Sequence, residues 1–409
     1  MPGFSAAQAR RGVERGFDGS LAFLRELVRV PSVLGAEEPA QALVEVRLRE
    51  LGFDVRSVVP DPARLAEIPH SGIPLMSYEG RRSLVATLGS GGGRSLTLNG
   101  HVDVVSAAPV ERWSKDPFGA ETADGRLYGR GSCDMKGGIA AMLLGVEAAL
   151  AAGPLPGTLV YQSVIEEECG GNGTLAAFLE TPPTDAALVA EPTDGGIDLA
   201  AVGVIWARIV LRADARHASN ADRGGNPIEG AYPVIAALHE LEAELNNDAP
   251  DPELAGIERP YLLNVGALHA GDWPSMTPGE AELDVRLGFP IRMEPATAQE
   301  LLAAAVARAD PTATVEFRGF RARGYAFDED APFVRLLARC HEEVRGGPLH
   351  AEPSRATTDL RFFEGQAVCY GPTGNGLHGV DEWVDLESIA DVATVIALLV
   401  RRWPGAGLA

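Results

Sequence analysis

Asp134 stands at the tip of a glycine-rich turn, and the chain continues from this turn into an apolar helical pattern at residues 139–152. The flanking glycines allow backbone to pack closely on both sides of the carboxylate. An aspartate in such a turn is, on its own, most often a turn residue or a helix cap. Asp134 becomes a candidate for chemistry because other stretches, far away in the sequence, carry imidazoles and carboxylates at the ends of apolar runs.

Three apolar runs that have the length of buried strands end in such groups. One run delivers His101 and Asp103, whose side chains lie on the same side of the backbone because directions alternate along a strand. The second ends in Glu166-Glu167-Glu168, three acids that repel one another unless they are solvated or bind cations. The third ends in Glu191. Since helical patterns separate these strands, the sequence predicts an α/β fold with a mainly parallel sheet and ligands at its carboxyl edge.

Length and composition limit the function classes. The 409 residues predict two domains, and a net charge of −22 argues against nucleic acid or an anionic membrane as partner, because both require a basic face. No stretch of about 18 apolar residues is present, and the N-terminus lacks the apolar core of a signal peptide, so we expect a cytoplasmic enzyme. The four cysteines form no CxxC pair, which argues against a cysteine-type zinc site or a redox pair.

The second half of the chain predicts an inserted α+β domain. Between residues 203 and 320 the expected elements follow the order βαββαβ, which is a split-βαβ sandwich of the ferredoxin-like type. The flanking segments would together form a catalytic domain. The predicted boundaries are 1–202 for the first part of the catalytic domain, 203–320 for the insertion and 321–409 for the second part.

Local signals predict three further features of the first part. We expect a helix at 17–30 and a long surface loop at 60–80, where prolines and turn formers are too frequent for a regular element. A glycine-rich run at 89–93 lies between predicted strands at 83–88 and 95–99. No Lys-Ser/Thr pair and no helix follow it, as a phosphate-binding loop would require, so we expect a hairpin turn.

With these residues placed, the chain resembles the M20 family of zinc metallopeptidases, a group that includes acetylornithine deacetylases, succinyl-diaminopimelate desuccinylases, aminoacylases and glutamate carboxypeptidases. The likeness runs from about Phe17 to Trp403. It rests on seven stretches that occur in family order: His101-Val-Asp103, Trp113 with Asp116-Pro-Phe118, Gly129-Arg-Gly131, Asp134-Met-Lys-Gly-Gly138, Glu167-Glu168, Glu191-Pro-Thr and His378-Gly-Val-Asp-Glu382.

The resemblance implies a role for each matched residue. Asp134 would bridge two zinc ions, Asp103 would orient a histidine ligand, and Glu167 would act as the general base. The remaining ligands would be His101 and Glu191 at one ion and Glu168 and His378 at the other. Nitrogen and oxygen ligands suit Zn²⁺, and Co²⁺ or Mn²⁺ could substitute for it. The peptide bond between Asp134 and Met135 would be cis, as it is in similar enzymes.

Within the acidic triplet, either adjacent pair could be the catalytic one. Family members typically read Asp-Glu-Glu-x-Gly, and anchoring the triplet on Gly170 makes Glu166 the equivalent of that aspartate. Glu167 is then the base and Glu168 the ligand. If the register is shifted by one residue, Glu166 is the base instead.

Three residues of the inserted domain match positions that contact substrate in similar enzymes. His217 matches a histidine that is presented to the active site of the partner subunit, where it stabilises the tetrahedral oxyanion; this implies a homodimer joined through a dimerisation or lid domain. Arg286 matches the position that holds a substrate carboxylate, which a guanidinium fork can bind with two hydrogen bonds. Ser275 stands where many relatives have asparagine, so substrate preference is expected to differ.

The resemblance favours a dinuclear zinc amidohydrolase that removes an acyl group from an N-acyl amino acid or a related amine, and the acidic triplet with its glycines looks most like the acetylornithine deacetylase branch. A metallo-dipeptidase or carboxypeptidase that uses the same site is the alternative. A binding protein that kept the scaffold but lost the chemistry is a third hypothesis, against which the intact ligand set and Glu167 argue.

Overall fold

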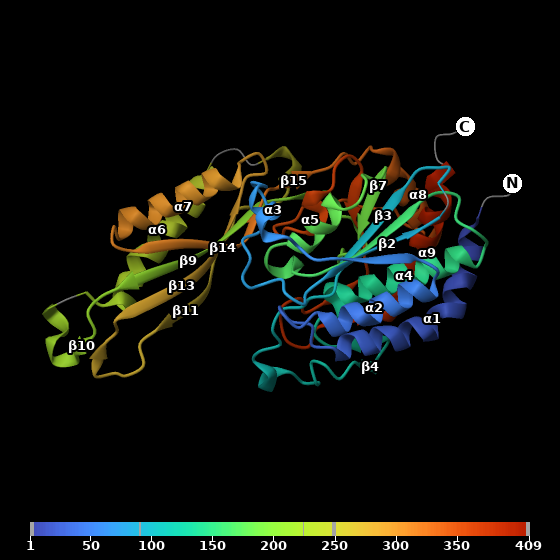
Figure 1. The fold of residues 1–409 in the computed structure, drawn as a ribbon. Coiled ribbons are helices and arrows are strands. Elements are labelled where there is room, and N and C mark those ends of the chain that lie inside the picture. The colour runs from blue at the N-terminus through green and yellow to red at the C-terminus, as the bar shows by residue number, and fades with distance from the viewer. Residues whose placement is uncertain (1–3, 90, 224, 248–250, 406–409) are drawn as a thin grey trace.

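The computed structural model describes residues 4–89, 91–223, 225–247 and 251–405. Its ribbon has two lobes, a larger one that contains both the first helix α1 (Ala6–Arg29) and the last helix α9 (Leu386–Arg402), and a smaller one built from a separate sheet and two helices (Figure 1). Each lobe has its own hydrophobic core.

A six-stranded sheet forms the centre of the larger lobe. Its strands, in spatial order, are β1 (Asp54–Val58), β2 (Ser83–Leu88), β6 (Leu159–Val164), β3 (Leu96–His101), β7 (Ala186–Val189) and β16 (Ala367–Cys369). The strands β6, β3, β7 and β16 run parallel, whereas β1 and β2 join them with antiparallel pairing. The sheet is therefore mixed. The strands that lead to the candidate histidine and glutamates, β3, β6 and β7, all belong to its parallel part.

Helix α4 (Gly137–Leu150) is the central helix of this lobe. Almost all of its residues are buried, as expected for a helix that is apolar on every side. It packs between α1 and α9. Helix α1 begins eleven residues earlier than the predicted helix at 17–30, because Ser5 and Gln8 form a capping box that satisfies the free backbone groups at the start of the helix.

The remaining elements of the larger lobe surround this core. The helices are α2 (Glu38–Glu50), α3 (Pro62–Ala66), α5 (Asn172–Leu179) and α8 (Pro332–Arg345). The short strands are β4 (Glu121–Ala123), β5 (Arg126–Tyr128), β17 (Gly374–Asn375) and β18 (Trp383–Asp385), which form one small sheet, and β8 (Ala200–Ala201) with β15 (Tyr325–Ala326), which form another.

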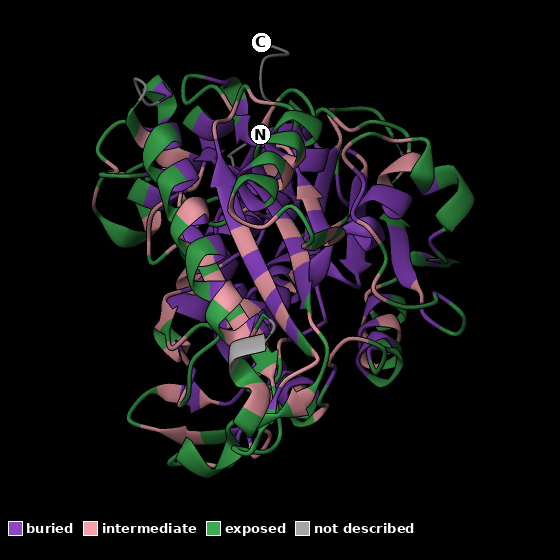
Figure 2. Ribbon diagram, turned by 90° about the vertical axis from the view of Figure 1, so that its left-hand side faces the viewer, coloured by how far each residue is buried: buried purple, intermediate pink, exposed green. Residues whose placement is uncertain are grey.

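The smaller lobe is an antiparallel sheet with helices on one face. Its elements follow one another as β9 (Gly203–Arg212), α6 (Pro227–Asn247), β11 (Leu263–Ala270), β13 (Glu280–Phe289), α7 (Pro295–Ala309) and β14 (Thr314–Ala322), in the order predicted from the sequence. The spatial order is β11-β13-β9-β14. Along these strands buried residues alternate with less buried ones, so the sheet has one face under α6 and α7 and one more open face (Figure 2). A two-stranded ribbon of β10 (Arg216–His217) and β12 (Met276–Thr277) extends the lobe.

Two local predictions are wrong. The strands β2 and β3 do not form a hairpin, because β6 lies between them in the sheet; Ser90, within the glycine-rich connection, lies outside the described residues. The segment 60–80 is not only a surface loop. It contains the short helix α3, it buries Tyr78, and Ile73 forms a β-bridge with Gly319 of the smaller lobe.

In the described part of the chain, the helices are too short or too polar for one of them to span a membrane.

Candidate metal centre

The parallel half of the larger sheet brings four of the candidate groups to one edge. His101 is the last residue of β3, Glu167 and Glu168 follow the end of β6 in a 3-10 turn, and Glu191 comes two residues after β7. These strands are neighbours in the order β6-β3-β7 and run in the same direction, so their carboxyl ends meet. Asp134 joins them from the loop before α4.

Asp134 lies between two imidazoles, with one carboxylate oxygen toward each. Its Oδ1 is 3.2 Å from His101 Nε2, and its Oδ2 is 3.4 Å from His378 Nε2. Each imidazole also faces a second carboxylate: His101 Nε2 is 3.7 Å from Glu191 Oε1, and His378 Nε2 is 3.0 Å from Glu168 Oε2. The groups therefore form two sets of nitrogen and oxygen atoms that share Asp134, which is the arrangement expected for a bridging ligand.

The loop that carries Asp134 is held by close packing at both ends. Gly131 has φ +78°, a conformation that favours glycine. A Cβ on Gly138, at the start of α4, would lie 2.0 Å from the carbonyl oxygen of Ala190, so only glycine allows the helix to approach the end of β7 this closely. The peptide bond between Asp134 and Met135 is cis, as the resemblance implied.

Glu382 organises the same loop, although sequence analysis gave it no role. Its carboxylate accepts hydrogen bonds from the backbone N–H groups of Gly131 and Cys133 at 2.9 Å and of Asp134 at 3.1 Å. It also forms a buried ion pair with Arg130. The family motif that ends at Glu382 was the available signal for its importance, but its contacts depend on the approach of two segments about 250 residues apart, which no local pattern reveals.

Replacing Glu382 with Gln is expected to destabilise the protein by about 3–5 kcal/mol, because the substitution leaves the buried guanidinium of Arg130 without its counter-charge. Denaturant-induced unfolding monitored by circular dichroism would measure the loss. Glu343→Gln is the matched control, since Glu343 pairs with Arg402 at a partly exposed site and should change stability by less than about 1 kcal/mol. Equal effects of the two substitutions would contradict this role of Glu382.

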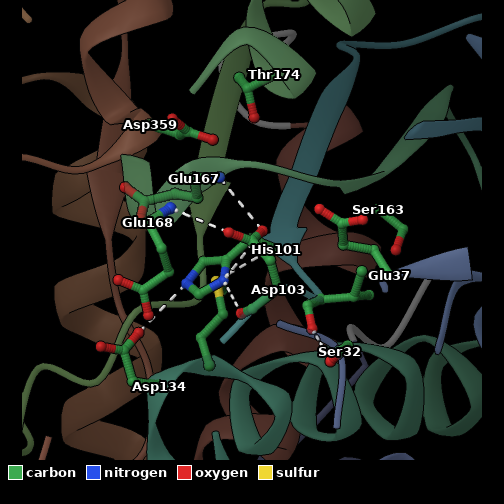
Figure 3. Close-up of polar contacts among 12 residues, drawn as sticks. Ser32, Glu37, His101, Asp103, Asp134, Ser163, Glu167, Glu168, Thr174 and Asp359 are labelled. Carbon is green, nitrogen blue, oxygen red and sulfur yellow. Dashed lines mark hydrogen bonds and ion pairs between the residues drawn. The ribbon is translucent and has the colours of Figure 1, made fainter. Parts of the chain in front are cut away.

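Asp103 contacts His101 mainly through its backbone carbonyl, not through its carboxylate. The outer nitrogen of the imidazole, Nδ1, lies 2.9 Å from the backbone carbonyl of Asp103 but 3.7 Å from its carboxylate. The carboxylate of Asp103 instead accepts hydrogen bonds from the backbone N–H groups of Glu167, at 3.2 Å, and Glu168, at 3.1 Å (Figure 3). The single residue Asp103 thus fixes both the ring of His101 and the turn that carries the two glutamates.

The acidic triplet divides between two environments. Glu166 points into a separate polar cluster, where Tyr78 donates a hydrogen bond to it at 2.9 Å and Arg81 lies 3.6 Å away. Glu167 lies within reach of His101 and Glu191, while Glu168 reaches the Asp134 side of the cluster. Glu166 thus faces Tyr78 and Arg81, whereas Glu167 and Glu168 face the cluster.

Electrostatics in the cluster reflect an excess of buried carboxylates. Burial raises the pKa of Glu167 well above its ordinary value, and nearby Asp359 raises it further. Burial also raises the pKa of Glu191 to about 7. Hydrogen bonds to Asp134 and Glu168 raise the pKa of His378 to about 11. For His101, burial acts in the opposite direction, but Glu191 and Asp134 outweigh it and hold the pKa well above its ordinary value.

These residues fit divalent cations. Four carboxylates face two imidazoles in the cluster, so positive charge is in short supply there, and Oε1 of Glu167 is buried without a hydrogen-bond partner among the described residues. Carboxylate oxygens and imidazole nitrogens without a thiolate form a donor set that Zn²⁺, Co²⁺ and Mn²⁺ accept. Two overlapping groups of the cluster, His101 with Asp134 and Glu168 and His101 with Glu167 and Glu191, have ligand atoms close enough to hold an ion.

A buried ion pair behind Glu167 was missed by sequence analysis. Arg361 lies 4.0 Å from Glu167 and 3.4 Å from Asp359, and it donates hydrogen bonds to the carbonyls of Thr358 and Gly170 at 2.7 Å and 3.0 Å. In the sequence, Asp359-Leu-Arg361 cannot be distinguished from an aspartate and an arginine that form an exposed ion pair on the surface. Only the tertiary packing shows that both side chains are buried beside the cluster.

A cavity of about 480 Å³ opens in front of the cluster and reaches the smaller lobe. The centre contributes Asp134, Glu167, Glu168, Glu191 and His378 to its lining. From the smaller lobe, Val204 and Trp206 of β9, Arg286 of β13 and Phe320 of β14 line the same cavity. Arg286, predicted to bind a substrate carboxylate, therefore lies where it can reach a molecule held at the cluster.

The structure does not bring His217 or Ser275 to the cluster of their own chain. Both residues lie at the β10–β12 ribbon, where His217 pairs with Met276 and the carbonyl of Ser275 accepts the N–H of Ala218 at 2.8 Å. The ribbon projects from the end of the smaller lobe that is farther from the larger sheet (Figure 1). His217 is exposed, and its Nδ1 lies 2.9 Å from the hydroxyl of Ser219.

Comparisons with known proteins agree in family and fold. A sequence model of peptidase family M20/M25/M40 matches residues 97–402. Succinyl-diaminopimelate desuccinylase of Phenylobacterium zucineum (strain HLK1) is 30% identical over 400 residues, which cover 93% of this chain and 97% of the relative. The desuccinylase of Methylibium petroleiphilum is 28% identical over 404 residues, which cover 94% of this chain and 97% of the relative.

Solved structures share the fold at lower identity. Human carnosine dipeptidase 1 superimposes with a TM-score of 0.78 at 17% identity, covering 98% of this chain and 100% of the other. The di-peptidase Dug1p of Saccharomyces cerevisiae gives a TM-score of 0.79 at 14% identity, covering 98% and 99%.

Proposed function

The chain belongs to peptidase family M20/M25/M40, and on that premise we propose that it is a two-metal amidohydrolase that removes an acyl group from an N-acyl amino acid or a related amine. As a member of this family it is a metal-dependent hydrolase of amide bonds. The two bacterial relatives named as desuccinylases, which are deacylases, support the choice of an acyl group.

The observation that carries the proposal is the position of Asp134, with each carboxylate oxygen facing a different imidazole and a second carboxylate behind each imidazole. Two ions would be held by His101 and Glu191 on one side and by Glu168 and His378 on the other, with Asp134 shared. We propose Zn²⁺ for both, with Co²⁺ and Mn²⁺ able to substitute. When bound, such ions supply Lewis acidity and lower the pKa of water.

Glu167 is the proposed general base. Its carboxylate lies at the cavity and next to the cluster, and one of its oxygens has no protein hydrogen-bond partner among the described residues. It takes a proton from the attacking water while the water oxygen forms a bond to the acyl carbon. It then gives that proton to the nitrogen as the C–N bond breaks, so that a carboxylic acid and an amine leave.

Hydrolysis of a substrate panel tests the proposal. Enzyme loaded with Zn²⁺ should release amino acid from N-acetyl amino acids faster than from dipeptides, and treatment with a chelator should abolish this activity until metal is restored. The second candidate is a metallo-dipeptidase or carboxypeptidase, which the fold of the dipeptidases with TM-scores of 0.78 and 0.79 favours. A preference for dipeptides would select it, and bound metal without hydrolysis of either class would indicate a binding protein.

We further propose that the enzyme is a homodimer in which His217 of each chain reaches the centre of the other. His217 is exposed and remote from the cluster of its own chain, and the smaller sheet offers β11 and β14 as edge strands for pairing with a second copy. A donor for the oxyanion is needed on the side of the substrate that faces away from the ions, because negative charge develops there in the transition state. An imidazole supplied by the second chain would meet this need.

Mixing two inactive variants tests the shared site. His217→Ala and Glu167→Gln should each lower kcat strongly, and His217→Ala should leave metal content unchanged. After subunit exchange, about half of the dimers are mixed and contain one site with both groups intact, so activity should return to about a quarter of the wild-type value. Exchange demonstrated by mass spectrometry without recovery of activity would show that His217 does not act across the dimer.

A further inference from the structure

We infer that the amino acid recognised by this enzyme carries one carboxylate and a large apolar side chain, held next to each other by Arg286 and by an aromatic wall of Trp206 and Phe320. This inference rests on the proposed amidohydrolase function and specifies its substrate. It follows from the register of the smaller sheet, from the residues that line the cavity and from the distribution of charge around it.

Arg286 and Trp206 are direct neighbours. They are Cα partners in the antiparallel pairing of β13 with β9, so their side chains stand side by side on the same face of the sheet. Both side chains line the cavity in front of the metal centre. If Arg286 binds the carboxylate of the substrate amino acid, the side chain on the neighbouring carbon therefore lies beside the indole ring of Trp206.

Arg286 is available for a carboxylate from the substrate. Its guanidinium donates a hydrogen bond of 2.7 Å to the backbone carbonyl of Arg355, and within the described residues it forms no ion pair. It is also the single Arg or Lys among the described residues that line this cavity. One carboxylate can thus be neutralised in the cavity by a protein cation outside the metal centre.

The wall beside Arg286 is aromatic and apolar. Trp206 and Phe320 meet edge to face with their ring centroids 5.0 Å apart, and Phe320 lies against the guanidinium of Arg361, next to Glu167. Ile197 and Val204 add aliphatic surface to the same cavity. A side chain adjacent to the bound carboxylate would remove apolar surface from water on this wall, which favours a large apolar group.

The remaining charges disfavour a second carboxylate. Besides the carboxylates of the metal centre, Asp194 and Glu352 line the cavity. Asp198 also lines it, but burial raises the pKa of its carboxyl to about 8, so we do not count it as a charge. A substrate with an acidic side chain or a dicarboxylic acyl group would bring another negative charge toward these residues, and the described lining of the cavity holds no second Arg or Lys to receive it. The charges around the cavity therefore favour a substrate with one carboxylate over a substrate with two or more.

Hydrolysis of N-acetyl amino acids that differ only in the side chain tests the inference. We expect kcat/KM for N-acetyl-phenylalanine to exceed that for N-acetyl-alanine and that for N-acetyl-glutamate by about 10-fold or more. Calorimetric titration of the Glu167→Gln variant, which should bind but not turn over substrate, should give the same order of affinities. A preference for glutamate or ornithine derivatives would overturn the inference while leaving the amidohydrolase function intact.

Two variants assign the preference to the wall. Trp206→Ala should lower kcat/KM for N-acetyl-phenylalanine by about 10-fold or more but change the value for N-acetyl-alanine by less than about 3-fold. Phe23→Ala is the control, because Phe23 lies on α1 and lines no part of this cavity. Parallel losses for both substrates in Trp206→Ala would contradict the proposed role of the indole. Absence of hydrolysis of every N-acetyl amino acid by the metal-loaded wild-type enzyme would overturn the proposed function itself, and this inference with it.

Discussion

Replacing Glu167 with Gln is expected to lower kcat by a factor of about 10²–10⁴ while the metal content stays at the wild-type level. The amide keeps the shape of the carboxylate but cannot accept a proton from water. Glu167 is 6 % exposed and lies at the cavity beside His101 and Glu191, where a proton can pass from an attacking water to the leaving nitrogen. Steady-state kinetics together with metal analysis by mass spectrometry would measure both quantities.

The two neighbouring glutamates serve as matched controls. Glu168→Gln should weaken metal binding, because Glu168 lies 3.0 Å from His378 and close to Asp134. Glu166→Gln should retain both metal and most activity, because its carboxylate faces Tyr78 and Arg81 instead of the cluster. If Glu166→Gln abolishes turnover and Glu167→Gln lowers metal content, the register anchored on Gly170 is shifted by one residue.

Replacing Asp134 with Ala is expected to abolish both tight metal binding and hydrolysis. One carboxylate faces both imidazoles, so its removal deletes a ligand from two ions at once, and loss of an ion ligand is rarely compensated by the remaining groups. Metal content after dialysis and kcat/KM at saturating Zn²⁺ would be measured on the same preparation. Circular dichroism would establish that the variant is folded.

Asp194→Ala is the control for Asp134→Ala. Asp194 lines the same cavity and carries the same charge, but it belongs to neither ligand group of the cluster. It should keep both ions, which separates the loss of a ligand from a general loss of negative charge around the cavity. Full metal occupancy and normal turnover in Asp134→Ala would rule out a bridging role for this carboxylate.

Local sequence patterns indicated His101, the acidic triplet and Glu191 as candidate groups, whereas His378 was included through the resemblance to the M20 family. An apolar run of strand length predicts a strand, and the residue that follows it shows which chemical group lies at the end of that strand. Both can be predicted because strand length and side-chain direction are local properties. The parallel orientation of β6, β3 and β7 then brings these ends together. The βαββαβ order of the smaller lobe followed from the same local patterns.

Strand order and the surroundings of the cluster were decided by tertiary structure. The strands β2 and β3 are consecutive in the chain and joined by a glycine-rich turn, yet β6 lies between them, because strand pairing depends on which surfaces the whole sheet buries. Similarly, the carbonyl of Asp103 reaches His101 while its carboxylate turns to Glu167 and Glu168, and that choice depends on how closely β3 approaches the turn after β6.

Contacts between distant segments account for the rest. Arg361 lies beside Glu167, although about 190 residues separate them in the chain. Glu382 accepts hydrogen bonds from the backbone N–H groups around Asp134, about 250 residues away. Trp206 and Arg286 become neighbours only through the register of β9 with β13. Local sequence patterns therefore predict which residues can do chemistry. The groups that orient these residues, and the proposed aromatic wall of Trp206 and Phe320, are brought into place only by long-range packing.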